Sequence, residues 1–285
     1  MQVIILLLVL LFLLGLAVGS FINVLEMRLY KEIDFVKSRS FCPKCKHVLS
    51  PIDLVPILSF ILLKGRCRYC GTKVSWQYPI IEFLSGLLFL ASGCYVIDRM
   101  RIQGVGDMLF VICIAIFISF ILVLFLFFAL YDVKHQIVPD KVIKPAIIIC
   151  LFIDVVFAVF MQLGIVNPIF DLFTDFSLLW NIVSCLFGGS FIALIIILTK
   201  GKGMGGGDLK LVVLMGLILG WKKLIIAFYL SVIIGSLVGI AWGIYKGKIK
   251  GLKVPFGLFL AIGTIIAFLF GDGIIDSYLM ISSFY

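Results

Sequence analysis

The sequence predicts an all-α polytopic membrane protein with about eight transmembrane helices. Of its 285 residues, 63% are hydrophobic and only 14% are charged, and the mean hydropathy is +1.27. A soluble domain of this length does not combine so little charge with so many long apolar segments. One extended polar region, residues 22–78, separates the first two apolar segments and holds two Cys-x-x-Cys pairs. We therefore expect a small zinc-stapled cytoplasmic loop domain between the first two helices.

The apolar segments predict where the membrane spans lie. The first begins without the positive n-region of a cleaved signal peptide, so we interpret it as a retained span. The sixth has only twelve residues. A helix that short is tolerated where its end is buried in protein or lines a watery cavity. The predicted spans are residues 3–21, 79–97, 109–131, 143–162, 177–199, 209–220, 224–245 and 254–271.

The net charge of +9 at pH 7 is explained by membrane topology. If the spans alternate across the bilayer, 20 of the 24 basic residues fall on one side, in the loops 22–78, 132–144, 200–210 and 246–253. Lys and Arg concentrate on cytoplasmic loops, so this side is predicted to be cytoplasmic and both termini to lie outside. The basic surplus therefore indicates the lipid bilayer as partner and no nucleic acid.

The two cysteine pairs predict a metal site. The polar region is too small to fold on its apolar core alone and needs a staple. Each Cys-x-x-Cys places two thiolates on one turn, and two such turns complete a tetrahedral zinc site. Paired disulfides or a redox pair are the alternatives, and a reducing cytosol disfavours both. We expect structural Zn²⁺ on Cys42, Cys45, Cys67 and Cys70.

Two carboxylates at the ends of predicted spans are candidate catalytic residues. Asp132 ends the apolar segment 109–131, and Asp208 follows Gly205-Gly206-Gly207 at the start of the short sixth span. Acids at such positions are costly and usually functional. Glycines before one allow close backbone approach or a sharp bend. Two facing carboxylates could share a proton and hold a water, as an aspartyl protease requires. The spacing fits an ion-pathway acid or a solvated loop acid equally well.

Three other acids have alternative interpretations. Asp140 follows Val138-Pro139 and precedes the fourth span, where an Asp is a natural N-cap, so we interpret it as structural. Glu82 lies one turn after Pro79 at the start of the second span. It can simply favour the helix N-terminus, yet its depth allows a functional contact. Asp154 lies well inside the fourth span and must have a partner.

Short motifs follow one another in a specific order along nearly the whole chain. They are Gly19-Ser20-Phe21-Ile22-Asn23-Val24, Arg28-Leu29, Cys42-Pro43-x-Cys45, Asp53-Leu54-Val55-Pro56, Leu58-Ser59-Phe60, Gly65-Arg66-Cys67-Arg68-x-Cys70, Tyr78-Pro79-x-x-Glu82, Asp132 with Ile137-Val138-Pro139-Asp140, Gly205-x-Gly207-Asp208, and Pro255-Phe256-Gly257. In this order and spacing the chain resembles the type IV prepilin peptidases, the bifunctional leader peptidases and N-methyltransferases of pilus, type II secretion and competence systems. It departs from the family at Tyr30 and Leu258, where Pro is usual or frequent.

The resemblance implies an activity and assigns the acids. Asp132 and Asp208 would be the catalytic pair, supported by Gly205 and Gly207. The enzyme would cleave prepilin or pseudopilin precursors after the Gly that ends the leader, and then methylate the new N-terminus from S-adenosylmethionine. No Gly-rich nucleotide loop supports methyl transfer, so Glu82 and the four-cysteine loop are the candidates for that site. The location would be the bacterial plasma (inner) membrane, with the active site at its cytoplasmic face.

The expected organisation has three parts: a first transmembrane helix at 1–21, a cytoplasmic four-cysteine domain at 22–78 and a transmembrane aspartyl peptidase domain at 79–285. Two other functions stay open. An ion-coupled transporter could use its intramembrane Asp residues, but it would need paired broken helices in matched halves, and the sequence has no such repeat. The second open function is that of a non-catalytic assembly factor whose loop is held together by zinc.

Overall fold

The computed structural model describes residues 2–33, 39–100, 105–163, 178–201, 204–247 and 254–282. Seven helices in these ranges are long and apolar enough to cross a membrane. The only β-pairing in the same ranges is two isolated bridges in the four-cysteine region. The prediction of an all-α polytopic membrane protein is therefore confirmed. Parts of the predicted polar loops, at 34–38, 164–177, 202–203 and 248–253, lie outside the described residues.

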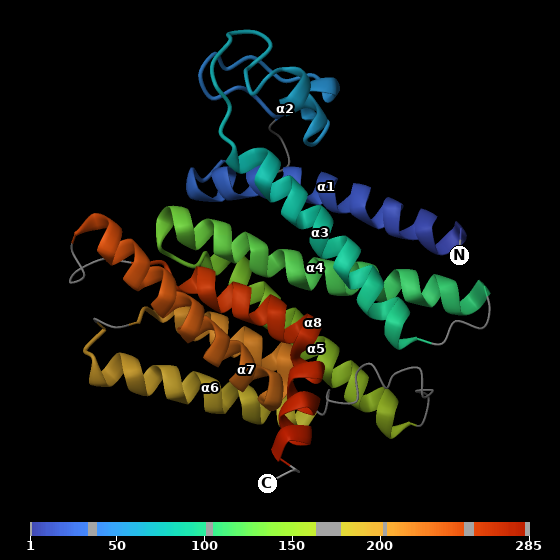
Figure 1. Ribbon diagram of the computed structural model, residues 1–285, viewed down its shortest axis with the longest axis vertical. Coiled ribbons are helices and arrows are strands. Elements are labelled where there is room, and N and C mark those ends of the chain that lie inside the picture. The colour runs from blue at the N-terminus through green and yellow to red at the C-terminus, as the bar shows by residue number, and fades with distance from the viewer. Residues whose placement is uncertain are drawn as a thin grey trace. The chain divides into compact units, whose positions relative to one another are not determined.

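The chain forms two compact units, Met1–Phe127 and Phe128–Tyr285. The N-terminal unit is built on α1 (Gln2–Tyr30) and α3 (Gln77–Arg99), which lie side by side (Figure 1). Gly19 brings the two backbones together, because a Cβ added there would lie 2.6 Å from Cα of Glu82. Small residues at helix contacts are typical of closely packed membrane helices. Beyond the predicted end of the span at residue 21, α1 continues because Ile22, Asn23, Glu26 and Arg28 are also buried.

The four-cysteine loop joins the end of α1 to the start of α3 (Figure 1). It contains a short 3₁₀-helix, η1 (Pro51–Leu54), and a single helical turn, α2 (Leu58–Leu62). No other regular element lies in its described part, residues 39–76. The helix α4 (Val105–His135) follows α3, and its last turns, from Phe128 onward, belong to the C-terminal unit.

The C-terminal unit continues through α5 (Asp140–Gln162), α6 (Leu178–Leu198), α7 (Gly206–Lys246) and α8 (Phe256–Ser282). The helix α7 is its centre and packs on α5, α6 and α8. It is broken at Gly220, which has φ 67° and ψ 176°. This conformation is open to glycine almost alone, so a single residue turns the chain sharply without a loop.

The break folds α7 back on itself. A Cβ added at Gly188 of α6 would lie 2.9 Å from a side-chain atom of Val212 and 3.0 Å from one of Leu224. These two residues would lie about 18 Å apart along a straight helix. The two parts of α7 are therefore the arms of a helical hairpin (Figure 1).

The hairpin contains two of the predicted spans. The sequence predicts separate helices at 209–220 and 224–245, and about eight in all. The structure has seven membrane-length helices in its described ranges, and one of them, α7, holds both of these segments as two helical arms on either side of Gly220. The predicted half-length helix is the first arm, which starts at Gly206 and carries Asp208 in its first turn.

Candidate active site and metal centre

Asp132 lies in the last turn of α4 and only 6% of it is exposed. Its Oδ2 accepts a hydrogen bond from the backbone N–H of Leu258 at 3.2 Å. A Cβ added at the preceding residue, Gly257, would lie 2.8 Å from the same oxygen. Leu258 and Gly257 belong to the first turn of α8, whose free N–H groups make a helix N-terminus a natural site for a carboxylate. The N-terminus of α8 therefore holds Asp132 in position.

Asp208 lies in the first turn of α7 and is half-buried. Its Oδ2 accepts a hydrogen bond from the backbone N–H of Gly205 at 3.0 Å, and its own N–H donates to the Gly205 carbonyl at 3.1 Å. This reciprocal pattern caps the start of the helix. The carboxyl group of Asp208 is thus fixed by the glycine-rich segment that precedes it.

The C-terminal unit brings the two acids together. A Cβ added at Gly257, beside Asp132, would also lie 3.2 Å from Cδ1 of Leu211, one turn after Asp208. The carboxyl groups of Asp132 and Asp208 are close enough to interact electrostatically. Two acids far apart in the sequence therefore lie where the end of α4 and the starts of α7 and α8 meet.

The glycines before Asp208 are not equivalent. A Cβ added at Gly207 would lie 3.0 Å from Cγ2 and 3.5 Å from the backbone nitrogen of Val138, in the short connection that follows Asp132. At Gly206 it would meet nothing within 4 Å, and at Gly205 its nearest neighbour would be Oδ2 of Asp208 at 3.8 Å. Gly207 is the position where the missing side chain sets the distance between the two acid-bearing segments.

Replacing Gly207 with Val should greatly lower the rate of any reaction that Asp132 and Asp208 catalyse together, although both carboxylates are still present. The added side chain must displace the connection that follows Asp132, and displacements of about 1 Å at a catalytic group cost roughly 10²-fold in rate. Gly206→Val is the matched control, because its side chain would point into open space. The rates of both variants should be compared at equal membrane content, and equal rates would show that the contact is incidental.

Asp140 plays a structural part at the start of α5. It is the first residue of that helix, and its carboxylate pairs with Lys144 at 2.9 Å and with Lys210 of α7. The sequence predicts that Asp140 caps the N-terminus of this helix. The structure places Asp140 at the helix start, but its carboxylate pairs with two lysine side chains. Asp154 of α5 is 3% exposed, and its Oδ2 has no hydrogen-bond partner among the described residues; the polar side chain near it is that of Asn181 of α6.

The four cysteines form two turns of identical design. In the first, Cys42 N–H donates to His47 and Lys46 N–H to Cys42, while Phe41 and Val48 form a β-bridge. In the second, the equivalent bonds join Cys67 to Thr72 and Gly71 to Cys67, and the bridge joins Arg66 and Lys73. The rings of His47 and Tyr69 stack across the two turns with their centroids 3.6 Å apart. The ring of His47 is therefore used in stacking.

The sulfur positions fit a tetrahedral metal site. The Sγ atoms of Cys42, Cys45, Cys67 and Cys70 all lie within 4.8 Å of one another, and those of Cys42 and Cys70 are 3.9 Å apart. A tetrahedron with Zn–S bonds of about 2.3 Å has S···S edges of roughly 3.8 Å. The hydroxyl group of Thr72 lies 3.2 Å from Sγ of Cys70, where it can donate a hydrogen bond to the thiolate that a metal needs. The four residues can therefore hold Zn²⁺.

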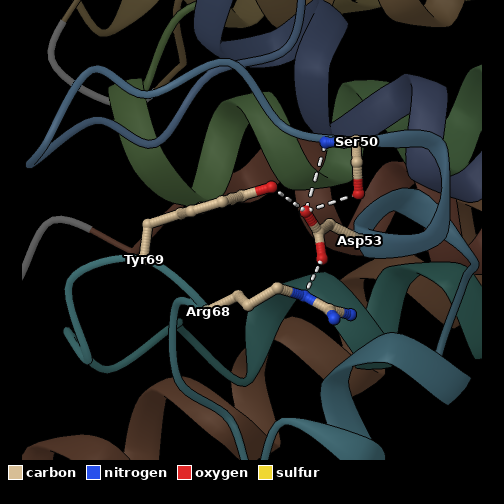
Figure 2. Close-up of polar contacts among 4 residues, drawn as sticks. All are labelled: Ser50, Asp53, Arg68 and Tyr69. Carbon is tan, nitrogen blue, oxygen red and sulfur yellow. Dashed lines mark hydrogen bonds and ion pairs between the residues drawn. The ribbon is translucent and has the colours of Figure 1, made fainter.

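A second network joins η1 to the second cysteine turn (Figure 2). Oδ2 of Asp53 accepts hydrogen bonds from the hydroxyl of Ser50 at 2.8 Å, the N–H of Ser50 at 3.1 Å and the hydroxyl of Tyr69 at 3.1 Å. Oδ1 accepts from Nε of Arg68 at 2.7 Å. Burial alone would raise the pKa of Asp53, but these donors, led by Ser50, outweigh it and hold the pKa below its usual range. The sequence alone shows Asp53 only as part of the motif Asp53-Leu54-Val55-Pro56 and does not indicate this role.

Asp53→Asn should loosen the loop at neutral pH. An Asp with a lowered pKa stabilises the fold above its unfolded pKa of about 3.9, and this contribution is lost as pH falls through the lower folded value. The wild-type loop should therefore be protected at pH 7 and lose protection below about pH 4, whereas the variant should lack this transition. Removing a charge-assisted bond costs roughly 1.5–3 kcal/mol. Hydrogen exchange across residues 50–70 measures it, with exposed Asp98→Asn as control; unchanged protection in Asp53→Asn would contradict the role.

Glu82 lies in the second turn of α3 and is 6% exposed. Its Oε2 accepts a hydrogen bond from the N–H of Ile57 in the loop at 2.7 Å, and the hydroxyl of Ser20 on α1 also donates to its carboxylate. The depth of Glu82 that its sequence position predicts is thus accompanied by a contact with the loop. Glu82 ties α1, α3 and the four-cysteine loop together.

Comparison with known proteins identifies the family. Residues 13–96 match the Bacterial Peptidase A24 N-terminal domain, and residues 119–240 match the Type IV leader peptidase family. A protein of Bacillus subtilis named prepilin leader peptidase/N-methyltransferase is 32% identical over 271 residues, covering 94% of this chain and 96% of its own. The chain belongs to the type IV leader peptidase family.

Proteins with the same name from Aeromonas hydrophila and Pseudomonas aeruginosa are each 29% identical and each cover 95% of this chain and 93% of their own. No solved structure matches the chain. In this chain the N-terminal match contains the four cysteines and Glu82, and the second match contains Asp132 and Asp208. The resemblance found in the sequence motifs is confirmed.

Proposed function

We propose that this chain is an aspartyl endopeptidase that removes the leader from prepilin-like precursors, with Asp132 and Asp208 as its catalytic pair. The observation that carries the proposal is the meeting of these two acids at three helix ends of one unit, with interacting carboxyl groups. Membership of a peptidase family supports the reaction class. The relatives' name, prepilin leader peptidase/N-methyltransferase, supports the substrate class and a second activity, methylation of the new N-terminus.

The reaction needs a water held between the two acids. One aspartate, ionised, takes the water's proton as the water attacks the scissile carbonyl, while the other, protonated, donates a hydrogen bond to the carbonyl oxygen. The N–H groups of Leu258 and Gly205 hold one oxygen of each carboxylate. Both acids then keep their orientation throughout the reaction.

The proposed location is the cytoplasmic face of the bacterial plasma membrane. The basic residues gather in the loops that flank both acids, which the positive-inside rule assigns to the cytoplasm. A substrate whose apolar helix lies in the bilayer, and whose basic leader stays in the cytoplasm, presents its cleavage site at this interface. Structural Zn²⁺ on the four cysteines would hold the loop of the N-terminal unit together.

The test is incubation of the purified protein with a precursor whose leader ends in Gly, followed by mass spectrometry of the products. We expect two fragments whose masses define cleavage after that Gly, and with S-adenosylmethionine present a mature fragment heavier by one methyl group. A precursor with Ile in place of the Gly should stay intact. Absence of cleavage in both precursors would contradict the proposal and favour a transporter or an assembly factor.

A further inference from the structure

The helix α2 of the four-cysteine loop exposes one apolar face. Its residues Leu58, Ile61 and Leu62 are all exposed, and Leu62 is 69% exposed. Positions i, i+3 and i+4 lie on the same side of a helix, so these three side chains form one apolar surface. Single exposed apolar residues are normal, whereas a contiguous apolar face indicates a partner or a lipid surface.

The apolar face is continuous with the start of α3. Trp76, the residue before α3, is 70% exposed, and its ring contacts that of Phe60 in α2 with the centroids 4.9 Å apart. Ile80 donates its N–H to the Trp76 carbonyl, lies one turn further along and is also exposed. Because α3 is long and apolar enough to span a membrane, we expect Ile80 to face lipid. An exposed Trp beside such a residue is typical of the membrane–water interface.

A buried hydrogen bond fixes the depth of α2. Oε2 of Glu82 accepts the N–H of Ile57 at 2.7 Å, and Ile57 is the residue directly before α2. Glu82 is buried in the second turn of α3, inside the predicted span 79–97. This bond therefore holds the start of α2 level with the first turns of a membrane helix, where the hydrocarbon region of the bilayer begins.

The contact of the loop with α1 gives the same depth. Leu54 and Pro56 of the loop line a cavity of about 540 Å³ together with Ala17 and Phe21 of α1. Ala17 lies four residues before the end of the predicted span 3–21, which is about 6 Å along a helix. The loop therefore packs beside α1 at the boundary of the hydrocarbon region and does not lie wholly beyond the end of the span.

The charge of the loop suits a surface of anionic lipid. Residues 39–76 contain seven basic residues and one acid, Asp53, whose carboxylate is bound by Arg68. The loop stays positive even with the negative charge of four thiolates on Zn²⁺. Lys64 and Arg66, which closely follow α2, are both exposed. Anionic headgroups attract such side chains, whose apolar stems can lie along a membrane surface while the charge stays in water.

We propose that the apolar face of α2, together with Trp76, inserts into the bilayer surface at which α1 ends and α3 begins. The partner is an anionic phospholipid leaflet. Leu58, Ile61 and Leu62 reach the boundary between headgroups and acyl chains, as the apolar side of an interfacial helix does. The four-cysteine loop then lies on the membrane surface, and this contact is independent of leader cleavage and of methyl transfer.

The test uses the full-length wild-type protein in vesicles of phosphatidylethanolamine and phosphatidylglycerol that include a phospholipid with a photoreactive diazirine in its acyl chain. After illumination, mass spectrometry locates the labelled residues. Ile61 and Leu62 should be labelled at a yield similar to that of Ile80. They should be labelled on the order of tenfold more than Lys44, an exposed residue of the first cysteine turn, because acyl chains do not reach a solvated turn.

A double variant tests whether the apolar face itself makes the contact. Leu58→Gln together with Ile61→Gln should lower the labelling of Leu62 several-fold and leave that of Ile80 unchanged. Both replaced side chains are exposed, so the loop should keep its fold, which unchanged zinc content verifies. Equal labelling of Leu62 in the wild type and this variant would overturn the inference.

Hydroxyl-radical footprinting of the same wild-type vesicles distinguishes the other possible surroundings of this face. Oxidation of Ile61 and Leu62 without lipid labelling would show that the face lies in water. Absence of both oxidation and lipid labelling would show that protein covers it, either the C-terminal unit or a second copy of the chain. Each of these results would overturn the inference.

Discussion

Replacing Asp132 with Asn, or Asp208 with Asn, should lower the rate of leader cleavage by about 10³-fold or more. Each change removes one half of a pair in which a base and a proton donor must act together, whereas an amide can replace neither. Asn is nearly isosteric with Asp and can still accept the N–H of Leu258 or Gly205. Both variants should therefore insert and fold normally, which size-exclusion chromatography and thermal unfolding can verify alongside initial rates.

Asp140→Asn is the matched control for the acid pair. Asp140 is close in sequence to Asp132, but its carboxylate is 45% exposed and pairs with Lys144 and Lys210. Exposed ion pairs contribute little to stability, so the variant should keep most of its cleavage activity. Normal cleavage by Asp132→Asn together with inactivity of Asp140→Asn would refute the assignment.

Replacing Cys42 and Cys67 with Ser together should remove the metal and loosen the four-cysteine loop. This loop has only a short 3₁₀-helix and one helical turn in its described part, so metal binding should supply much of its folding free energy. The acid pair belongs to the other compact unit, so cleavage should survive at least in part. Methylation should fall further if its site includes this loop, which with Glu82 is the candidate for that site.

Metal content by mass spectrometry and both activities should be measured on one preparation of this double-cysteine variant. The control is Cys94→Ser, an exposed cysteine outside the cluster, which should keep the metal and both activities. Absence of zinc from the wild-type protein would refute the structural metal. Equal loss of cleavage and methylation in the variant would refute the separation of the two activities.

Hydropathy predicted most of the fold because each membrane helix must be a long apolar segment. It separated the two arms of α7 because Lys222 and Lys223 after Gly220 interrupt the apolar pattern as a loop would. A single glycine conformation makes the turn in the structure, and no periodicity signals it. The contact of both arms with Gly188 is equally absent from local sequence.

The sequence predicts those residues of the candidate site that stand in a recognisable local pattern. Asp132 and Asp208 stand at the ends of apolar segments, and two cysteine pairs at metal-ligand spacing are distinctive. The supporting contacts join distant parts of the chain and leave no such pattern. Leu258 N–H on Asp132 and Ile57 N–H on Glu82 are backbone groups, which any residue type provides. The motif Pro255-Phe256-Gly257 was the one available signal for the first of them.

The central claim, that Asp132 and Asp208 act as one catalytic unit, is tested most directly by a double variant. Single-turnover cleavage of a precursor with a Gly-terminated leader should be measured for Asp132→Asn, Asp208→Asn and the variant that carries both changes. Residues that act as a unit show strongly non-additive losses. We predict that the double variant cleaves no more slowly than the slower single variant. A rate reduced by the product of the two single losses would show independent roles and contradict the account.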